Sequence, residues 1–244
     1  MITRRQTMFW LTASSVGLVS ACAHASTNDD FFTAIIRDNA SAVTSLLQRG
    51  FDPNTLNPDG QPALVFALQK DSLKAFDALL QSRKIKVEMR NKKGESALMI
   101  AAIKGNLEAA KALIARDGDV NKTDWTPLHY AASGTTDKAV PMIELLLEKH
   151  AYIDAASPNG TTPLMMAVRY GTADAARLLI AEGADPTIKN EKGLTAIDFA
   201  RQAERNDMVQ AVTEAINKRR QQPSTGRPQS APTQNPAPAQ RGAW

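Results

Sequence analysis

The side chains that could bind a metal or act as nucleophiles are few and scattered in this 244-residue sequence. Its one cysteine is Cys22, and its three histidines are His24, His129 and His150. None of the histidines has neighbouring Cys, Asp or Glu residues at the spacing of a metal site. The sequence also has no glycine-rich phosphate loop and no serine in a nucleophile-elbow motif. We therefore expect no catalytic, cofactor or metal site, and the interpretation that remains is a non-enzymatic binding protein.

An apolar motif recurs along the chain at a nearly fixed period. Its most complete version is the segment Asp124–Ala132. The marker residues of the five versions are Leu64, Leu98, Leu128, Leu164 and Ile197, spaced by 34, 30, 36 and 33 residues. A period close to 33 residues predicts a solenoid built of stacked, similar units.

The local sequence predicts two helices in each unit. Thr126-Pro127 and Thr162-Pro163 each combine a capping hydroxyl with a proline suited to the first helical position. About twelve residues later, apolar residues recur at the i, i+3, i+4 spacing of a buried helix face. We expect that second helix to end at residues that tolerate a left-handed backbone, namely Gly50, Asp117, His150 and Gly183.

The segment Thr126–Ala131 matches in full the T-P-L-H-x-A core of the ankyrin repeat family, which the chain therefore resembles. The segment Leu179–Asp185 resembles the end of the second helix of that family. The resemblance covers residues 29–218 as six units. It implies an all-α solenoid of about six helix-turn-helix units with short hairpin loops. It further implies that His129 is structural and hydrogen-bonds near Thr126.

The resemblance also implies where a protein partner docks, on the concave side made of hairpin tips and first helices. In each unit the relevant positions are the residue after the turn glycine and the pair before the helix–helix turn. Trp125, Arg169 and Tyr170 are of types that often dominate binding energy, although Trp125 could equally serve to cover its own hairpin. The candidate partner-binding residues are Gln61, Lys70, Glu95, Lys104, Trp125, Thr161, Arg169 and Tyr170.

Two departures from the period make the surface uneven near the fourth unit. The hairpin between Asn121 and Trp125 is about three residues short, and residues 134–140 add about three residues between the next two helices. Pro141 then fits only in the first turn of the second helix, where its missing N–H has no partner to lose. The basic segment 83–93 is either a surface for an acidic partner or a solvated edge.

Residues 1–25 have the pattern of an export signal, with Arg4 and Arg5 before an apolar run. An ordinary cleavage site follows Ala25, whereas residues 19–22 resemble a bacterial lipobox that would place a lipid on Cys22. Residues 3–6 also resemble a twin-arginine signal. Each alternative leads to the bacterial envelope, as a periplasmic protein or a periplasm-facing lipoprotein.

The last segment, 219–244, is rich in proline and glutamine and is basic, which predicts a disordered tail. The net charge of +4 is too mild to indicate a nucleic-acid partner. We expect a monomer that binds and modulates one protein in the envelope, including the case of a toxin-neutralising protein. Its contact with the membrane would be limited to the lipid at Cys22. The alternative is a cell-wall or membrane tether that uses the basic tail.

Overall fold

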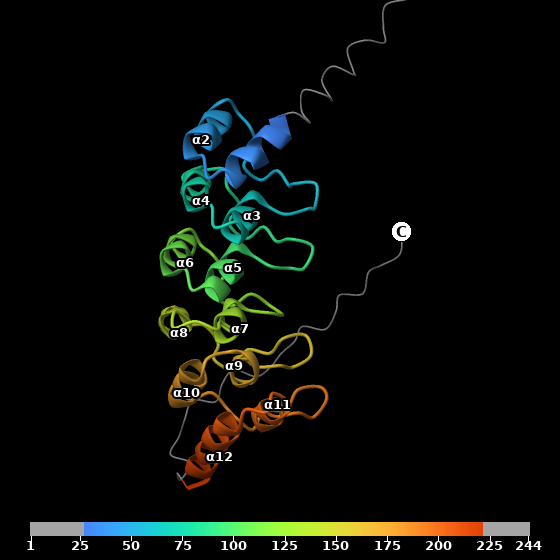
Figure 1. Ribbon diagram of the computed structural model, residues 1–244, viewed down its shortest axis with the longest axis vertical. Coiled ribbons are helices and arrows are strands. Elements are labelled where there is room, and N and C mark those ends of the chain that lie inside the picture. Colours follow the sequence, from blue (N-terminus) through green and yellow to red (C-terminus); the bar gives the residue numbers. More distant parts are fainter. Residues whose placement is uncertain (1–26, 222–244) are drawn as a thin grey trace, which may run out of the picture.

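The computed structural model describes residues 27–221, and every regular element there is a helix (Figure 1). The β pairing present within that range is one isolated bridge between Leu56 and Pro62. The all-α prediction is therefore confirmed.

Twelve helices form six helix-turn-helix pairs stacked along one axis (Figure 1). The first pair is the helix 27–36 with α2 (Ala40–Gln48). The inner helices of the other pairs are α3 (Ala63–Gln69), α5 (Ala97–Lys104), α7 (Pro127–Ala132), α9 (Pro163–Tyr170) and α11 (Ala196–Gln202). The outer helices are α4 (Leu73–Leu80), α6 (Leu107–Ile114), α8 (Ala139–Glu148), α10 (Ala173–Ala181) and α12 (Asn206–Gln221).

The motif residues form the core between neighbouring pairs. Leu64, Leu98, Leu128 and Leu164 are at most 2% exposed, and Leu79, Leu113, Leu146 and Leu179 of the outer helices are fully buried. Because each unit buries its apolar residues against the units beside it, the stack is one continuous body.

The predicted helix boundaries are confirmed in detail. The side chains of Thr126 and Thr162 accept hydrogen bonds from the amides of His129 and Met165 at the starts of α7 and α9. Pro141 lies in the first turn of α8. The left-handed residues after the outer helices are Gly50, Asp117, His150 and Gly183, with φ angles of 93°, 62°, 63° and 98°.

Five hairpins connect the pairs and project from the inner column of helices (Figure 1). One polar side chain in each of the first four accepts a hydrogen bond from a backbone N–H of the next hairpin. The pairs are Asn54 with Lys86, Glu88 with Asp119, Asn121 with Tyr152, and Asp154 with Asp185, at 2.8–2.9 Å. In the last hairpin the equivalent residue, Thr187, instead donates to Asp185 of its own hairpin at 2.7 Å. We call this series of contacts the hairpin ladder.

The final helix continues beyond the expected end of the repeat domain. Residue 218 was predicted as its boundary, but α12 continues to Gln221. Arg219 makes an ion pair of 3.1 Å with Asp185 of the last hairpin, so this basic residue belongs to the folded array and not to the tail.

Several predictions concern residues outside the described range. They are the export signal 1–25, with Arg4, Arg5, Cys22 and Ala25, and the tail from residue 222 to residue 244. Within residues 27–221, no helix has both the length and the apolar character needed to cross a bilayer.

Candidate binding surface

Seven of the eight candidate residues lie at the ends of inner helices or of hairpins with at least part of the side chain accessible. Lys70 and Tyr170 are exposed at the C-terminal ends of α3 and α9. The other five are partly buried, namely Gln61, Glu95, Lys104, Trp125 and Arg169. These seven residues therefore have the positions and the exposure that a role in binding requires.

Thr161 does not belong to this set. It is 2% exposed, its N–H donates to Ser157 Oγ at 3.0 Å, and its carbonyl accepts from His129 Nε2 at 2.9 Å. The prediction for Thr161 is wrong, because the neighbouring unit covers the position that its register alone placed on the surface.

His129 is a buried structural residue, as the family resemblance implies. Its ring is fully buried, with Nδ1 facing Thr126 Oγ1 at 2.8 Å and accepting from the Thr126 N–H at 3.2 Å. Nε2 donates to the carbonyl of Thr161, and the ring is neutral because Nδ1 accepts a hydrogen bond and so carries no proton. Burial lowers the pKa of His129 to about 4, although the Thr161 carbonyl partly opposes this shift. A neutral imidazole therefore connects unit four to unit five.

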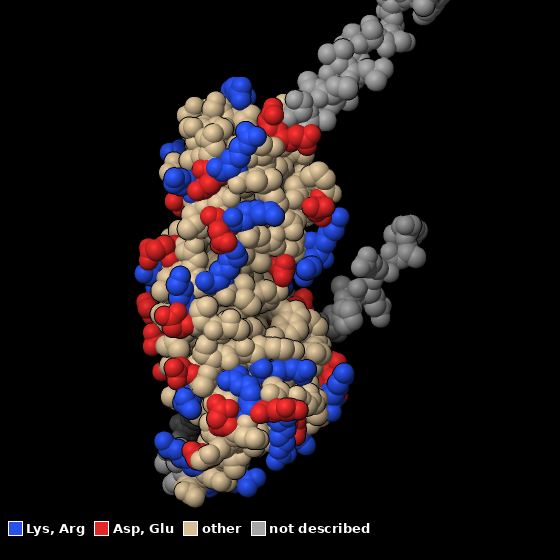
Figure 2. Space-filling view, viewed as in Figure 1, with Lys and Arg blue, Asp and Glu red and all other residues tan. Residues whose placement is uncertain are grey.

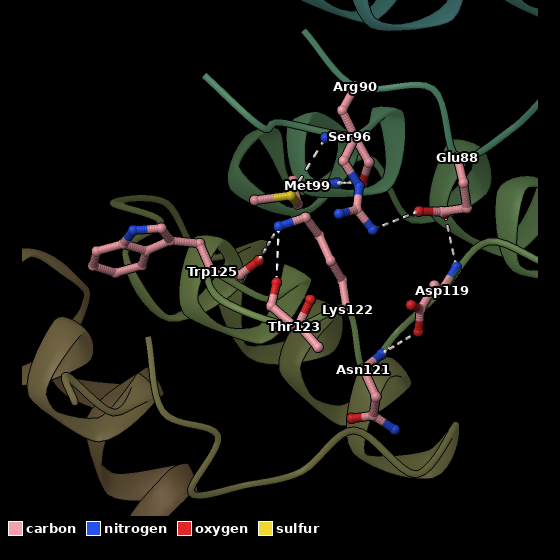
Figure 3. A network of polar contacts seen from close by, with 9 residues as sticks. All are labelled: Glu88, Arg90, Ser96, Met99, Asp119, Asn121, Lys122, Thr123 and Trp125. Atoms are coloured by element: carbon pink, nitrogen blue, oxygen red, sulfur yellow. Dashed lines mark hydrogen bonds and ion pairs between the residues drawn. The ribbon is translucent and has the colours of Figure 1, made fainter. Parts of the chain in front are cut away.

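The hairpin before α7 is the shortest of the five, with residues 115–126 joining α6 to α7. In the other hairpins an Asn or Ser donates its N–H to the carbonyl four residues later; the pairs are Asn57–Gln61, Asn91–Glu95, Ser157–Thr161 and Asn190–Leu194. The shortened loop has no such turn. Lys122, only 4% exposed, donates its ammonium to the carbonyls of Thr123 at 2.9 Å and Trp125 at 3.5 Å (Figure 3).

Burial lowers the pKa of Lys122, and the positive charge of Arg90 adds to that shift. No carboxylate of residues 27–221 lies within ion-pair distance of its ammonium. Figure 3 shows the side chain running beneath the hairpin backbone while the Trp125 ring points away from this network. Lys122 thus holds the hairpin backbone in place of the missing turn. The indole ring of Trp125 takes no part in these hydrogen bonds.

We expect Lys122→Ala to lower the free energy of unfolding by about 1–2 kcal/mol, because two hairpin carbonyls lose their charged donor. Hydrogen exchange of the amides of residues 123–126 should accelerate more than that of the helices. The matched control is Lys93→Ala, an exposed lysine of the preceding hairpin, which should change neither quantity. Equal exchange in both variants would show that Lys122 does not hold the loop.

Trp125 is half-buried, and its ring packs edge-on against His129 with centroids 5.3 Å apart. Nearby, Tyr130 donates its hydroxyl to Glu95 Oε1 at 3.2 Å. Burial, with the Glu95 charge beside it, raises the pKa of Tyr130 above its usual range. The middle of the surface therefore presents aromatic rings whose positions are fixed by neighbours.

Two of the three candidate cations, Arg169 and Lys104, are held by contacts between units. The Arg169 guanidinium donates to Gln202 Oε1 at 3.0 Å and lies 5.2 Å from the ring centre of Tyr170. Lys104 donates to Asp71 Oδ1 at 2.7 Å and to the carbonyl of Gln69 at 3.1 Å. Such contacts limit the rotamer entropy lost when a partner binds.

Four exposed apolar side chains were not expected from the sequence. They are Ile36, Leu56, Leu73 and Tyr152, with 57%, 43%, 43% and 65% exposure. The exposure of Ile36 could have been predicted from the repeat period, because Ile36-Arg37 occupies the same place in the first unit as Gln69-Lys70 in the second. In the described part of the chain, no group of three or more His, Cys, Asp or Glu residues could hold a metal ion.

The family model for ankyrin repeats in three copies matches residues 31–124, 83–156 and 136–222, which together span most of the chain. The chain belongs to the ankyrin repeat family. The nuclear factor NF-kappa-B p105 subunit from Gallus gallus is 33% identical over 172 residues, covering 68% of this chain and 17% of that protein. A B-cell lymphoma 3 protein homolog from Mus musculus is 30% identical over 175 residues, covering 69% of this chain and 38% of that protein.

Solved structures of ankyrin repeat proteins show the same arrangement. A chain in the complex of a predatory endopeptidase from Bdellovibrio bacteriovorus with an immunity protein superposes with a TM-score of 0.65 at 30% identity, covering 76% of this chain and 97% of that one. An ankyrin repeat domain from Acinetobacter baumannii gives a TM-score of 0.64 at 19% identity, which shows the fold alone. The ankyrin repeats indicate a protein–protein interaction module, a scaffold that is typically non-enzymatic.

Proposed function

We propose that this ankyrin repeat protein is exported to the bacterial envelope, where it binds one protein and neutralises it. The observation that carries the proposal is the similarity to nearly the whole of a chain in a complex between a bacterial endopeptidase and an immunity protein. The export signal expected in residues 1–25 supports the location, since Arg4, Arg5 and either Cys22 or Ala25 would direct the chain to the periplasmic side.

The binding site in this proposal is the surface around Trp125 and Tyr170. Trp125 and Tyr130 come from the unit with the short hairpin, and Arg169 and Tyr170 follow in the next unit. Large aromatic and arginine side chains in the centre of an interface often supply most of its binding energy. Figure 2 shows that the surface over these middle units carries few charges compared with the units above and below them. An apolar centre of this kind fits a protein partner.

The test begins with affinity capture from envelope extract, followed by measurement of affinity for the protein identified. We expect Trp125→Ala combined with Tyr170→Ala to weaken binding by roughly 30-fold or more. The melting temperature should fall by only a few degrees, because neither ring is fully buried.

The matched control is Tyr152→Ala, which removes another exposed aromatic side chain, at 65% against 51% for Tyr170, from a hairpin. Affinity that is unchanged in the Trp125 and Tyr170 variant, together with a large loss of stability, would contradict the proposal. Recovery of cell-wall material in place of a protein would favour the tether.

A further inference from the structure

The helix–helix turns of the first three units, which include the candidate residues Lys70 and Lys104, have features of their own. Each turn exposes one aliphatic side chain: Ile36 at 57%, Leu73 at 43% and Ile103 at 39%. These are half of the six large apolar residues that are exposed in residues 27–221. Exposed aliphatic side chains gathered in one place mark interaction sites more often than the same residues scattered singly.

Uncompensated cations accompany these aliphatic side chains. Arg37, Lys70 and Lys74 are exposed, and none has a carboxylate within ion-pair distance in the described part of the chain. The outer helices α6, α8 and α10 differ, because one cation on or beside each of them pairs with a nearby acid. These pairs are Lys111 with Glu108, Lys149 with Glu148, and Arg177 with Asp174, at 3.1, 3.1 and 3.3 Å.

Hydrogen bonds join the three turns into one surface. Asp38 of the first turn accepts from the Ala75 N–H at the start of α4, at 2.8 Å. Lys104 of the third turn reaches Asp71 of the second at 2.7 Å. Asp38 and Asp71 keep their negative charges, but the four cations of these turns, Arg37, Lys70, Lys74 and Lys104, outnumber them, so the surface is net positive as well as apolar. We call Ile36, Arg37, Lys70, Leu73, Lys74 and Ile103 the turn surface.

We propose that the turn surface binds an acidic segment of a protein partner that carries regularly spaced aliphatic residues. Desolvated aliphatic side chains favour apolar contacts, and the unpaired cations favour carboxylates. Each unit supplies one aliphatic side chain, and Figure 2 shows Lys and Arg side chains at intervals over the upper units, with Asp and Glu side chains and uncharged surface between them. This arrangement follows the axis of the stack, which suits a polypeptide chain better than a flat bilayer. The inference deepens the proposed function, on which it rests, because it names the chemistry of one partner segment.

The test uses the full chain and a fluorescein-labelled peptide of four Glu-Glu-Leu repeats, with a Gln-Gln-Leu peptide for comparison. In fluorescence anisotropy, the acidic peptide should bind, and its affinity should fall as salt is raised. The triple variant Arg37→Gln, Lys70→Gln, Lys74→Gln should weaken this binding about tenfold or more. The matched triple variant Lys111→Gln, Lys149→Gln, Arg177→Gln has the same net charge and should bind as the unaltered chain does. Both triples change exposed residues, so their stability should stay within about 0.5 kcal/mol of the unaltered chain.

Three results would overturn the inference. The acidic peptide could fail to bind, or the two triple variants could lose the same affinity through general electrostatics. Vesicles containing phosphatidylglycerol could bind through Arg37, Lys70 and Lys74 when the peptide does not, which would assign the surface to a membrane.

The proposed function fails separately from this inference. An envelope partner that binds the turn-surface variant at full affinity would leave the proposed function intact and remove the turn surface from it. If the peptide binds but no envelope protein is captured, the inference about the turn surface stands and the proposed function fails.

Discussion

Lowering the pH from about 7 to about 4 is expected to reduce the free energy of unfolding by about 3 kcal/mol through His129 alone. Its pKa is about 4 in the folded chain, because the ring is buried, against 6.5 for an unburied histidine. Between these two values the unfolded chain binds a proton that the folded chain does not, so stability falls as the pH falls. Urea unfolding followed by circular dichroism over this range measures the slope.

The chain provides a matched replacement for His129. At the same position in other units, Met99 and Met165 each place a sulfur 3.4 Å from the N–H of the capping residue. His129→Met should therefore keep the cap but lose the hydrogen bond to Thr161, which costs about 1 kcal/mol at neutral pH. The slope between pH 6.5 and 4 should become much shallower. An unchanged slope would assign the acid sensitivity to carboxylates, among which Asp198 has a pKa lowered by hydrogen bonds from Thr195.

Gly171→Ala is expected to lower the free energy of unfolding by about 2–4 kcal/mol. A Cβ atom at Gly171 would meet the carbonyl oxygen of Ala132 in the preceding unit, with the backbone of Ala167 also too close. Arg205 holds the same turn from the other side, donating to the carbonyls of Gly171 at 2.7 Å and Ala167 at 3.2 Å. The turn therefore has little room to shift away from the added methyl group.

Gly193→Ala separates this steric effect from backbone strain. Gly193 has a φ of +73° but no heavy atom within 4 Å of the position of a Cβ. Its replacement should cost only the strain of a left-handed alanine, about 1–2 kcal/mol. Chemical denaturation of both variants gives the comparison. A smaller loss for Gly171→Ala than for Gly193→Ala would mean that units four and five are not in tight contact.

Features set by a few neighbouring residues were predictable from the sequence. The caps at Thr126 and Thr162, the left-handed Asp117 and His150, and the place of Pro141 all follow from local backbone chemistry, and the structure confirms them. The 33-residue period added the stacking of units, because a unit that exposes one apolar face needs a neighbour to cover it.

Features that depend on contacts between units were not predictable in the same way. Thr161 has the register of a surface residue, yet Ser157 and His129 enclose its backbone. Lys122 is buried because it donates to two carbonyls that the shortened loop leaves without other donors. Secondary-structure propensities contain no information about such a contact. Arg219 lies in α12 and pairs with Asp185 of the last hairpin, a contact between residues far apart in the sequence. The partner-binding role of the seven remaining candidates stays a prediction.

The hairpin ladder gives the array a direction and an end. Each acceptor side chain from Asn54 to Asp154 binds an N–H of the following hairpin. While the chain is being synthesised, the acceptor of the newest of these hairpins therefore has no partner from the ladder until the next hairpin forms. At the last hairpin, Thr187 turns back to Asp185, whose other oxygen pairs with Arg219. The last hairpin thus satisfies its polar side chains within itself and through α12, whereas each of the four earlier hairpins contributes an acceptor to the hairpin that follows it.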